Sequence, residues 1–440
     1  MAETNVTEVA ADDAAAPQHG RRMVALLGGT TTAADCGLAL RYLLDLRHLV
    51  KGPAITEFER AFAAEIGVRH ALSFATGRVA LYGLLRSLGI GAGDDVMFQV
   101  PTHVVVANAI RYTGARPVYV DCERETYNLD LADAKRRVTP QTKALVLQHT
   151  FGMPADLDAV VSFTEAQGLV LIEDCVHSLG ATYGGRAVGS FGRAAIFSTE
   201  ETKTLTTTMG GMVVTDDSAL ATSLRRFQDG CSWPALSLTA RYVTKLIAYH
   251  LLTDPWVYGY TRALYLWLGR RQPFPGATTE EERRGLPTDN LEQRLSNAQA
   301  ALGLRQLRRL GANVEHRRSI AAKCEQELSR HGFDMLPAPP KADPALIRYP
   351  VRVSNRDRAV RAAARHVVLG TWFTSVLEES VSPAVGDYRQ GSCPRAEEAV
   401  KQLINLPTHP RITRRDVKVI IEALAAAEDD ARPSGGDAPT

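Results

Sequence analysis

The chain has 440 residues, of which 45% are hydrophobic and 23% are charged, the balance of an ordinary soluble globular protein. Its formal net charge of +2 excludes binding to nucleic acid or to a membrane through overall charge alone. The length is sufficient for a large core and for two lobes.

The two ends of the chain are predicted to be disordered tails, over residues 1–22 and 428–440. The first of them is acidic and lacks the apolar stretch of a secretory signal. The six cysteines form no CxxC pair and no metal-ligand spacing. We therefore expect reduced thiols in a cytoplasmic protein, and no metal site.

Apolar periodicity along the first half of the chain predicts an α/β fold. Helices are expected within residues 31–49, 57–66 and 78–88. Short apolar runs that read as strands occur at residues 68–74, 96–98, 117–120, 144–148, 169–172, 194–197 and 211–214. Strands that alternate with helices in this way predict a mostly parallel sheet covered by helices on both faces.

Residues 236–272 interrupt this alternation. The segment is aromatic and helical, and Asp254-Pro255 divides it into two pieces. It contains no run of about eighteen apolar residues, so it is not predicted to span a bilayer. Its tryptophans, tyrosines and arginines suit a membrane interface. The alternative is an insertion that packs on its own domain or on a partner subunit.

The last part of the chain is predicted to form a second, smaller lobe. Helices are expected over residues 293–310 and 316–331, followed by a strand at 347–353 and helices at 356–367 and 415–425. We place a large domain, including the aromatic insertion, over residues 23–315, and a small C-terminal domain over residues 316–427.

Chemically active side chains follow two of the predicted strands. One strand ends in Glu173 and Asp174, and the next ends in Ser198 and is followed by Lys203. Open α/β sheets bind ligands at the carboxyl ends of their strands. Pyridoxal phosphate needs a lysine to hold its aldehyde and a buried carboxylate to keep its ring nitrogen protonated. On spacing alone, the alternative is a strand-end acid and a surface lysine of an unrelated α/β protein.

The order of motifs resembles the sugar-nucleotide aminotransferases of the DegT/StrS type, which are pyridoxal-phosphate enzymes of fold type I. The resemblance runs from about residue 52 to residue 424. It includes the pieces GPAITEFERAFAAEIGVRHAL, LIEDCVHSLGA, GSFGRAAIFS followed by TK, and LPTHPRIT. It implies a large cofactor-binding domain, a small α+β domain, and a homodimer whose two sites are each built from both subunits.

The resemblance also implies roles for individual residues. Lys203 would hold the cofactor, Asp174 would pair with its ring nitrogen, and the hydroxyl of Ser198 would bind its phosphate. His177 stands where the family has the glutamine or histidine that reaches the ring oxygen. His103 stands where the family has the aromatic residue that covers the ring.

Several positions depart from the family pattern. Gly77-Arg78 replaces Gly-Thr at a helix start, where backbone N–H groups suit a phosphate and Arg78 offers a guanidinium. A solvated residue at the start of a helix is the alternative reading of Arg78. Glu292 replaces the asparagine that reaches the partner's cofactor phosphate, and we expect the retained Arg294 to compensate. The substrate-facing histidine of the C-terminal lobe is not evident in GTWFTSVLEES.

We therefore expect an aminotransferase that moves an amino group from glutamate or glutamine to a keto sugar, a cyclitol or a related carbonyl compound. Retention of Lys203, where a dehydrating branch of the family has histidine, favours transamination. The altered positions and the aromatic insertion suggest a non-standard acceptor, such as a lipid-linked one, and peripheral membrane contact. The alternatives are a pyridoxal-phosphate dehydratase or lyase, and a non-catalytic regulator. No nucleic-acid partner is expected.

Overall fold

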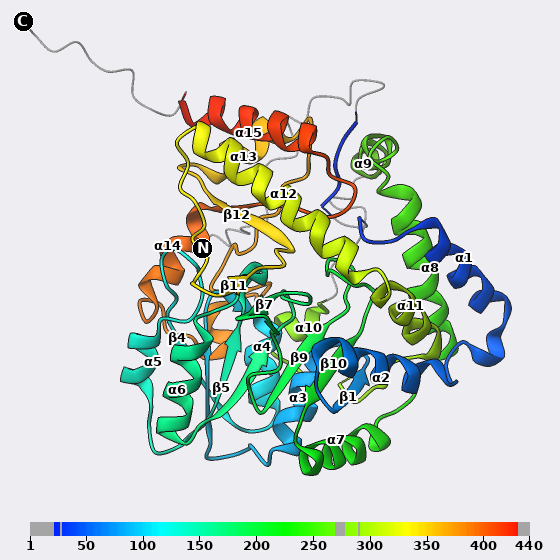
Figure 1. Cartoon of the computed structure of the whole chain (residues 1–440), viewed down its shortest axis with the longest axis vertical. Coiled ribbons are helices and arrows are strands. Elements are labelled where there is room, and N and C mark those ends of the chain that lie inside the picture. Colours follow the sequence, from blue (N-terminus) through cyan, green and yellow to red (C-terminus); the bar gives the residue numbers. More distant parts are fainter. Residues whose placement is uncertain (1–21, 27–28, 269–277, 289–290, 430–440) are drawn as a thin grey trace, which may run out of the picture.

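The computed structural model describes residues 22–26, 29–268, 278–288 and 291–429 (Figure 1). Apart from Arg22, Glu428 and Asp429, the two predicted tails lie outside the described residues. Glu428 and Asp429 form the end of the last helix, α15 (Arg414–Asp429).

A seven-stranded sheet forms the centre of the large domain. Its order is β1 (His70–Phe74), β10 (Gly211–Thr215), β9 (Ala194–Ser198), β6 (Val170–Asp174), β5 (Thr142–Gln148), β2 (Asp95–Gln99) and β4 (Arg116–Val120). Strand β10 runs against its two neighbours, and the other pairs in this sheet are parallel. Every predicted strand of the first half is present, and the predicted mostly parallel sheet is confirmed. The carboxyl ends of β1, β9, β6, β5 and β2 therefore meet at one edge.

Helices cover both faces of the sheet, because successive strand residues point to opposite sides. Val96 and Phe98 join one apolar core, whereas Met97 between them joins the other. The first core lies under α3 (Gly77–Ser87), α4 (Val104–Tyr112) and α7 (Ser218–Gly230). The second lies under α2 (Ala54–Ile66), α5 (Leu131–Arg137), α6 (Leu157–Gln167) and α11 (Asn297–Leu307).

The aromatic segment forms two helices, α8 (Leu236–Leu252) and α9 (Tyr258–Trp267), as the Asp254-Pro255 break predicts. The apolar side of α8 packs on α1 (Ala33–Leu44) and on α11 around Leu246. In Figure 1, helices α1, α8 and α11 lie to the right of the sheet, and α9 lies above them, level with the small lobe. The last residues of the predicted insertion, from 269 onward, lie outside the described residues.

The small lobe begins on the long helix α12 (Leu310–Arg330) and lies above the sheet in Figure 1. Its two-stranded antiparallel sheet pairs β12 (Arg348–Arg352) with β14 (Leu403–Pro407). Four helices share a core with this sheet, namely α12, α13 (Arg356–Ala363), α14 (Pro394–Gln402) and α15. Strand β14 and the preceding α14 (Pro394–Gln402) were not predicted from the sequence.

The remaining elements are short, and two of them join the lobes. β3 (Thr102–His103), at the start of α4, pairs in parallel with β13 (Leu377–Glu378) of the small lobe. The others are η2 (Leu46–His48), η3 (Thr150–Gly152), β7 (Thr182–Tyr183), β8 (Arg186–Ala187), α10 (Glu280–Arg283), β11 (Ala342–Asp343) and η4 (Pro383–Gly386).

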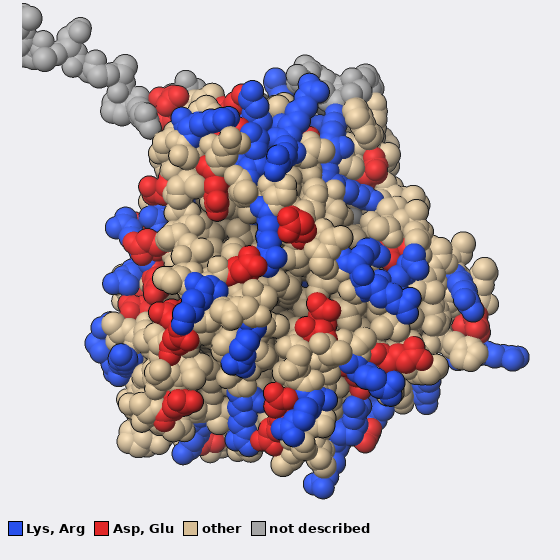
Figure 2. All heavy atoms as spheres, in the orientation of Figure 1, with Lys and Arg blue, Asp and Glu red and all other residues tan. Residues whose placement is uncertain are grey.

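The surface carries mixed charge. Figure 2 shows lysines and arginines interspersed with aspartates and glutamates over the visible face. This face therefore presents no broad field of a single sign. Among the described residues, none of the helices combines the length and the apolar character needed to cross a bilayer.

Candidate active site

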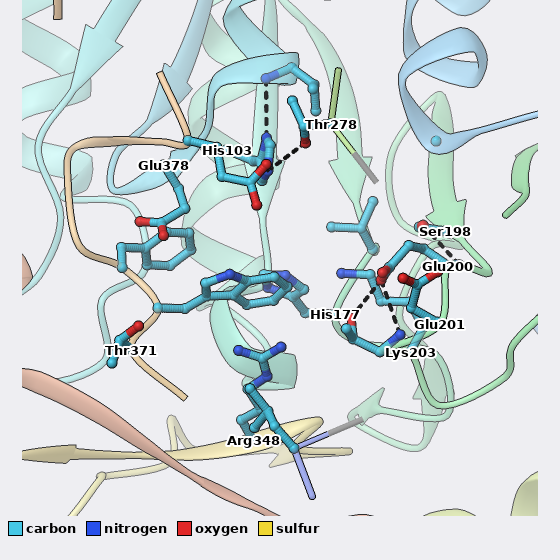
Figure 3. A pocket seen from close by; sticks show the side chains of 18 of the residues that line it. His103, His177, Ser198, Glu200, Glu201, Lys203, Thr278, Arg348, Thr371 and Glu378 are labelled. Carbon is cyan, nitrogen blue, oxygen red and sulfur yellow. Dashed lines mark hydrogen bonds and ion pairs between the residues drawn. The ribbon is translucent and has the colours of Figure 1, made fainter. Parts of the chain in front are cut away.

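A cavity of about 620 Å³ opens at the carboxyl edge of the sheet, under the small lobe. Its walls come from strand ends of the large domain, from the small lobe and from α9. Of the predicted site residues, all except Arg294 line this cavity, namely Gly77, Arg78, His103, Asp174, His177, Ser198 and Lys203. Figure 3 shows how several of these side chains converge.

Asp174 is the acid of the Glu173-Asp174 pair that faces the cavity. Its carboxylate is buried and accepts a hydrogen bond of 3.2 Å from the amide of Val176. Burial raises the pKa of Asp174 to about 6, although the charges of Lys203 and His149 oppose this rise. A positively charged ring nitrogen beside it would restore the ionised form.

Glu173 points to the opposite face of the sheet and has a structural role. Its carboxylate accepts the amide hydrogens of Gly189, Phe191 and Gly192 at 2.7–2.8 Å. Glu173, His149 and Cys175 lie close enough to suggest metal ligands. The loop amides already occupy both oxygens of Glu173, so this cluster is explained by hydrogen bonding.

Lys203 lies in the turn that follows β9, where its amide donates to the carbonyl of Glu200 at 3.1 Å. Its side chain is buried, and its Nζ lies 4.9 Å from the centroid of the Trp372 ring. Burial lowers the pKa of Lys203 to about 8; the charge of Arg348 lowers it as well, whereas Glu200 and Asp174 raise it. The neutral form of this amine, which a nucleophile requires, is therefore more accessible than in an ordinary lysine.

Ser198 and the start of α3 form one end of the cavity. Gly211 lies opposite both Phe74 and Ser198 in the sheet register, which brings the end of β1 beside Ser198. A Cβ at Gly211 would stand 2.2 Å from the carbonyl oxygen of Thr76, so only glycine allows this approach. A serine hydroxyl beside a helix N-terminus is suited to a phosphate.

Arg78 lines the cavity but is not an isolated cation. Its guanidinium forms an ion pair with the buried carboxylate of Glu282 in α10. The side chain is therefore anchored to a segment far along the chain, and its role at a phosphate remains a prediction.

His177 is buried, and its Nδ1 has no hydrogen-bond partner among the described residues. Its ring stacks on Trp372, with centroids 5.3 Å apart. Burial, and then the charges of Lys203 and Arg348, lower the pKa of His177 well below its usual value. A neutral imidazole with an unsatisfied nitrogen in a cavity wall is suited to a ligand oxygen.

His103 lies across the cavity at the junction of the two lobes. Its Nε2 is 3.4 Å from the carboxylate of Glu379 and 3.4 Å from the hydroxyl of Thr278. Burial opposes ionisation of Glu379, but the hydrogen bond and charge of His103 hold the pKa of Glu379 down, at about 2. The residue is thus held by polar contacts, and coverage of a cofactor ring by its imidazole remains a prediction.

Taken together, these groups fit pyridoxal phosphate. The buried Asp174 suits the ring nitrogen, Lys203 suits the aldehyde, the unsatisfied nitrogen of His177 suits the ring oxygen, and Ser198 with the α3 amides suits the phosphate. The fit rests on complementary chemistry at four points of one cavity.

Several cavity residues were not predicted from the sequence. Arg348 and Trp372 come from the small lobe, and Glu378 lies opposite His103 in the β3–β13 pair. None of the three stands near Lys203 in sequence or follows a strand of the main sheet. Only the chain path between the lobes brings them into the cavity.

Glu201 was also missed, although it stands two positions before Lys203 in the sequence. Its carboxylate accepts hydrogen bonds from Lys245 at 2.9 Å and Tyr249 at 2.7 Å, both on α8. Its second oxygen is buried without a partner among the described residues. Burial raises the pKa of Glu201 to about 7, with a further rise from Glu200 and an opposing effect of Lys245.

Arg294 lies outside the cavity of its own chain. Its guanidinium donates to the carbonyl of Cys231 at 3.2 Å and to Asp229 at 3.1 Å, and it lies 4.7 Å from the ring centroid of Trp233. The expected contact with a partner's cofactor involves a second subunit, so it remains a prediction.

Helix α9 supplies part of the cavity wall through Tyr258, Arg262 and Tyr265. A model of the DegT/DnrJ/EryC1/StrS aminotransferase family matches residues 33–251 and 276–425. The match includes nearly all of α8 but omits residues 252–275, which contain α9. Only the second half of the predicted insertion therefore lies outside the family match.

The chain is similar to individual known proteins over nearly their full length. A GDP-perosamine synthase of Caulobacter vibrioides is 30% identical over 386 residues, which cover 85% of this chain and 90% of that protein. A UDP-2-acetamido-2-deoxy-3-oxo-D-glucuronate aminotransferase of Pseudomonas aeruginosa is 28% identical, covering 86% and 92% respectively. The crystal structure of DesV from S. venezuelae is 30% identical, with a TM-score of 0.71, covering 90% of this chain and 95% of that one.

Proposed function

The chain belongs to the DegT/DnrJ/EryC1/StrS aminotransferase family, and from this membership we propose that it transfers an amino group from glutamate or glutamine to a keto sugar in the cavity around Lys203. The predicted pyridoxal-phosphate dependence and aminotransferase activity are confirmed at the level of the family. The observation that carries the proposed site is the convergence of buried Asp174 and Lys203 from adjacent strands on one cavity.

Each residue has a role that follows from its surroundings. When bound, pyridoxal phosphate supplies an electron sink that makes the α-proton of the donor acidic. Lys203 Nζ, in its neutral form, would take this proton from the donor α-carbon and deliver it to the C4′ carbon of the cofactor; in the second half of the reaction it would move a proton from C4′ to the acceptor carbon. Asp174 favours a protonated ring nitrogen, and Ser198 with the α3 amides holds the phosphate.

Separation of the two half-reactions tests this function. The cofactor-loaded protein, mixed with glutamate or glutamine and no acceptor, should release one 2-oxo acid per active site. A keto sugar added afterwards, either nucleotide-linked or lipid-linked, should gain the amino group, detected by mass spectrometry with a ¹⁵N-labelled donor. Loss of water from the sugar without gain of nitrogen would support the dehydratase alternative. Absence of both reactions with every acceptor and donor would support a non-catalytic regulator.

The acceptor is the finer part of the proposal. The names of the relatives from Caulobacter vibrioides and Pseudomonas aeruginosa refer to sugars carried by GDP and UDP. In this chain α9 places Tyr258, Arg262 and Tyr265 in the cavity wall, within the segment that the family match omits. We therefore propose an acceptor that contacts α9 and is larger or more apolar than a standard nucleotide sugar, such as a lipid-linked keto sugar.

The outer side of the same helix supports a peripheral membrane contact. Trp256 and Trp267 are 62% and 80% exposed, and Leu264 and Leu268 are also largely exposed. A helix with one side at the cavity and the other side aromatic and apolar is suited to receive a substrate from a membrane surface.

Assembly and location complete the proposal. We propose a homodimer in which Arg294 approaches the partner's cofactor, on the strength of the EQRLSNAQAALG motif. We also propose a cytoplasmic location, since all six cysteines are free thiols.

A further inference from the structure

Arg348, the first residue of β12, is a buried arginine that forms no close ion pair among the described residues, although the charges of Glu200 and Glu378 act on it from a greater distance. Its exposure is 4%, and its side chain lines the cavity. The guanidinium lies 3.7 Å from the centroid of the Trp372 ring. Within the described part of the chain it makes no hydrogen bond and no ion pair. A buried charge without a partner is costly, so the fold retains it against its own stability.

A neighbouring arginine shows how this fold treats a structural guanidinium. Arg317 is equally buried, yet it donates to Asn313 at 3.0 Å, to the carbonyl of Ile347 at 3.1 Å and to Thr408 at 3.0 Å. The donors of Arg317 are thus met by the protein, as is usual for buried polar groups. The hydrogen-bond donors of Arg348 are instead available to a ligand that enters the cavity.

The position of Arg348 identifies which part of a ligand it would meet. Arg348 and Lys203 both lie against the Trp372 ring, at 3.7 Å and 4.9 Å from its centroid. Figure 3 shows the side chain of Arg348 rising from the lower part of the view toward the middle of the cavity, with Lys203 to its right and Ser198 above Lys203. Arg348 therefore lies near Lys203, close enough for its charge to lower the pKa of that amine, whereas the phosphate end belongs to Ser198 and α3.

In every amino-acid donor, the carbon that bears the reacting amine also bears a carboxylate, so this carboxylate is an anion that would lie close to Lys203. A planar guanidinium binds a carboxylate through two parallel hydrogen bonds, and burial strengthens both. We propose that Arg348, backed by the face of Trp372, binds a substrate carboxylate in the active site. The carboxylate belongs either to the amino donor, next to its amine, or to an acidic keto sugar as acceptor. This inference rests on the proposed function.

Calorimetry tests the carboxylate site without turnover. The probes are glutarate, an unreactive dicarboxylate, and glutaramide, its neutral diamide, each titrated into the cofactor-loaded protein. Arg348→Gln should weaken glutarate binding roughly tenfold to hundredfold, the range expected for loss of hydrogen bonds between charged groups. Arg348→Lys should retain part of the affinity, because it keeps the charge but loses the fork. Glutaramide binding should change less than twofold in both variants.

The control is Arg352→Gln. Arg352 ends the same strand but faces a different cavity and donates to the carbonyl of Arg124 at 2.8 Å. Its replacement should leave glutarate affinity unchanged. Equal glutarate affinity in the unaltered protein and in a folded Arg348→Gln variant would overturn the inference, as would failure of the unaltered protein to bind glutarate.

The half-reactions then distinguish the two sources of the carboxylate. Glutamine carries an α-carboxylate and a side-chain amide, whereas isoglutamine carries an α-amide and a side-chain carboxylate. If Arg348 binds the donor, Arg348→Gln should slow the first half-reaction with glutamine at least tenfold and remove the preference for glutamine over isoglutamine. If it binds the acceptor, only the second half-reaction with an acidic keto sugar should slow. Unchanged rates in both halves would overturn the inference and leave the proposed function intact, whereas Arg348-dependent glutarate binding without any amino transfer would refute the function alone.

Discussion

The ammonium group of Lys245 on α8 lies 2.9 Å from the carboxylate of Glu201, which stands two residues before Lys203. Tyr249, one helical turn further along α8, donates to the same oxygen at 2.7 Å. The turn that carries Lys203 is therefore held from outside the main sheet. Because Glu201 is buried, its charge depends on these two contacts.

Removal of Lys245 should destabilise this turn. Lys245→Met leaves the buried Glu201 carboxylate without its counter-ion, and we expect a loss of about 2 kcal/mol of unfolding free energy at pH 8, measured by urea denaturation. The double variant Lys245→Met, Glu201→Gln should recover most of this loss. The control Lys418→Met removes an exposed partner of Glu422 and should change stability by less than about 0.5 kcal/mol. Equal effects of the two lysine variants would contradict the interpretation.

The pH dependence of Lys203 follows from its surroundings. Burial lowers the pKa of Lys203 to about 8, so its amine loses a proton at a lower pH than an ordinary lysine. In the cofactor-free protein, modification of Lys203 by an amine-reactive reagent should rise with pH and reach half its maximal rate near pH 8. Peptide mapping by mass spectrometry follows the site, and the exposed Lys341 serves as the internal control.

A second variant links this titration to Arg348. Because the charge of Arg348 lowers the pKa of Lys203, Arg348→Gln should move the titration to higher pH. The Arg352→Gln variant should leave it in place. A Lys203 profile centred near the usual lysine value in the unaltered protein would show that the amine is more hydrated than the structure indicates.

Asp174 should control the chemical step rather than substrate affinity. Asp174→Asn cannot stabilise a positive charge on the ring nitrogen, so the donor half-reaction should slow at least a hundredfold, the scale of a lost electrostatic contact in an active site. The fold should survive, because the amide replaces a carboxylate whose burial is already unfavourable. Stopped-flow absorbance of the bound cofactor separates the chemical rate from donor affinity. Weaker donor binding with an unchanged chemical rate would refute the role.

The sequence was sufficient to predict the seven strands and the meeting of Asp174 with Lys203. Both rest on local signals, namely short apolar runs and the polar residues that end them. Contributions that depend on the chain path were not predictable. Glu378 meets His103 through a parallel pair of two-residue strands, which are too short for any periodic pattern. Arg348 was visible only as one charged residue of a predicted strand.

The aromatic insertion shows a second limit of the sequence. Its composition and the Asp254-Pro255 break predicted two helices, and both are present. Composition could not show that one side of α9 lines the cavity while the other is exposed, since both sides carry aromatic residues. Which side of α9 faces the cavity depends on how α8 packs on α1 and α11, and the sequence does not show that packing.

Mixed subunits test the proposed dimer. If each site joins Lys203 of one subunit with Arg294 of the other, Lys203→Ala and Arg294→Ala proteins should each be inactive alone. Co-refolded together, they should regain activity up to about a quarter of the unaltered level, because half of the dimers are hybrids and each hybrid has one intact site. Analytical ultracentrifugation should show a dimer in every sample. A fully active monomer, or an active Arg294→Ala homodimer, would exclude the composite site.

The exposed side of α9 should bind anionic membranes. Trp256 and Trp267 are 62% and 80% exposed in the isolated chain, and the segment between them also carries the exposed Tyr260 and Leu264. Transfer of these side chains to a bilayer interface would contribute several kcal/mol at about 25 cal/mol per Å² of apolar area. Burial in a subunit interface would contribute as much, so only a direct measurement separates the two.

In liposome flotation at moderate salt, the unaltered protein should rise with anionic vesicles, and the Trp256→Ser, Trp267→Ser variant should not. The control Met335→Ser, which removes an exposed apolar side chain of the small lobe, should float like the unaltered protein. If the unaltered protein stays at the bottom of the gradient while the double tryptophan variant loses its dimer in sedimentation, the aromatic side of α9 is a subunit interface instead.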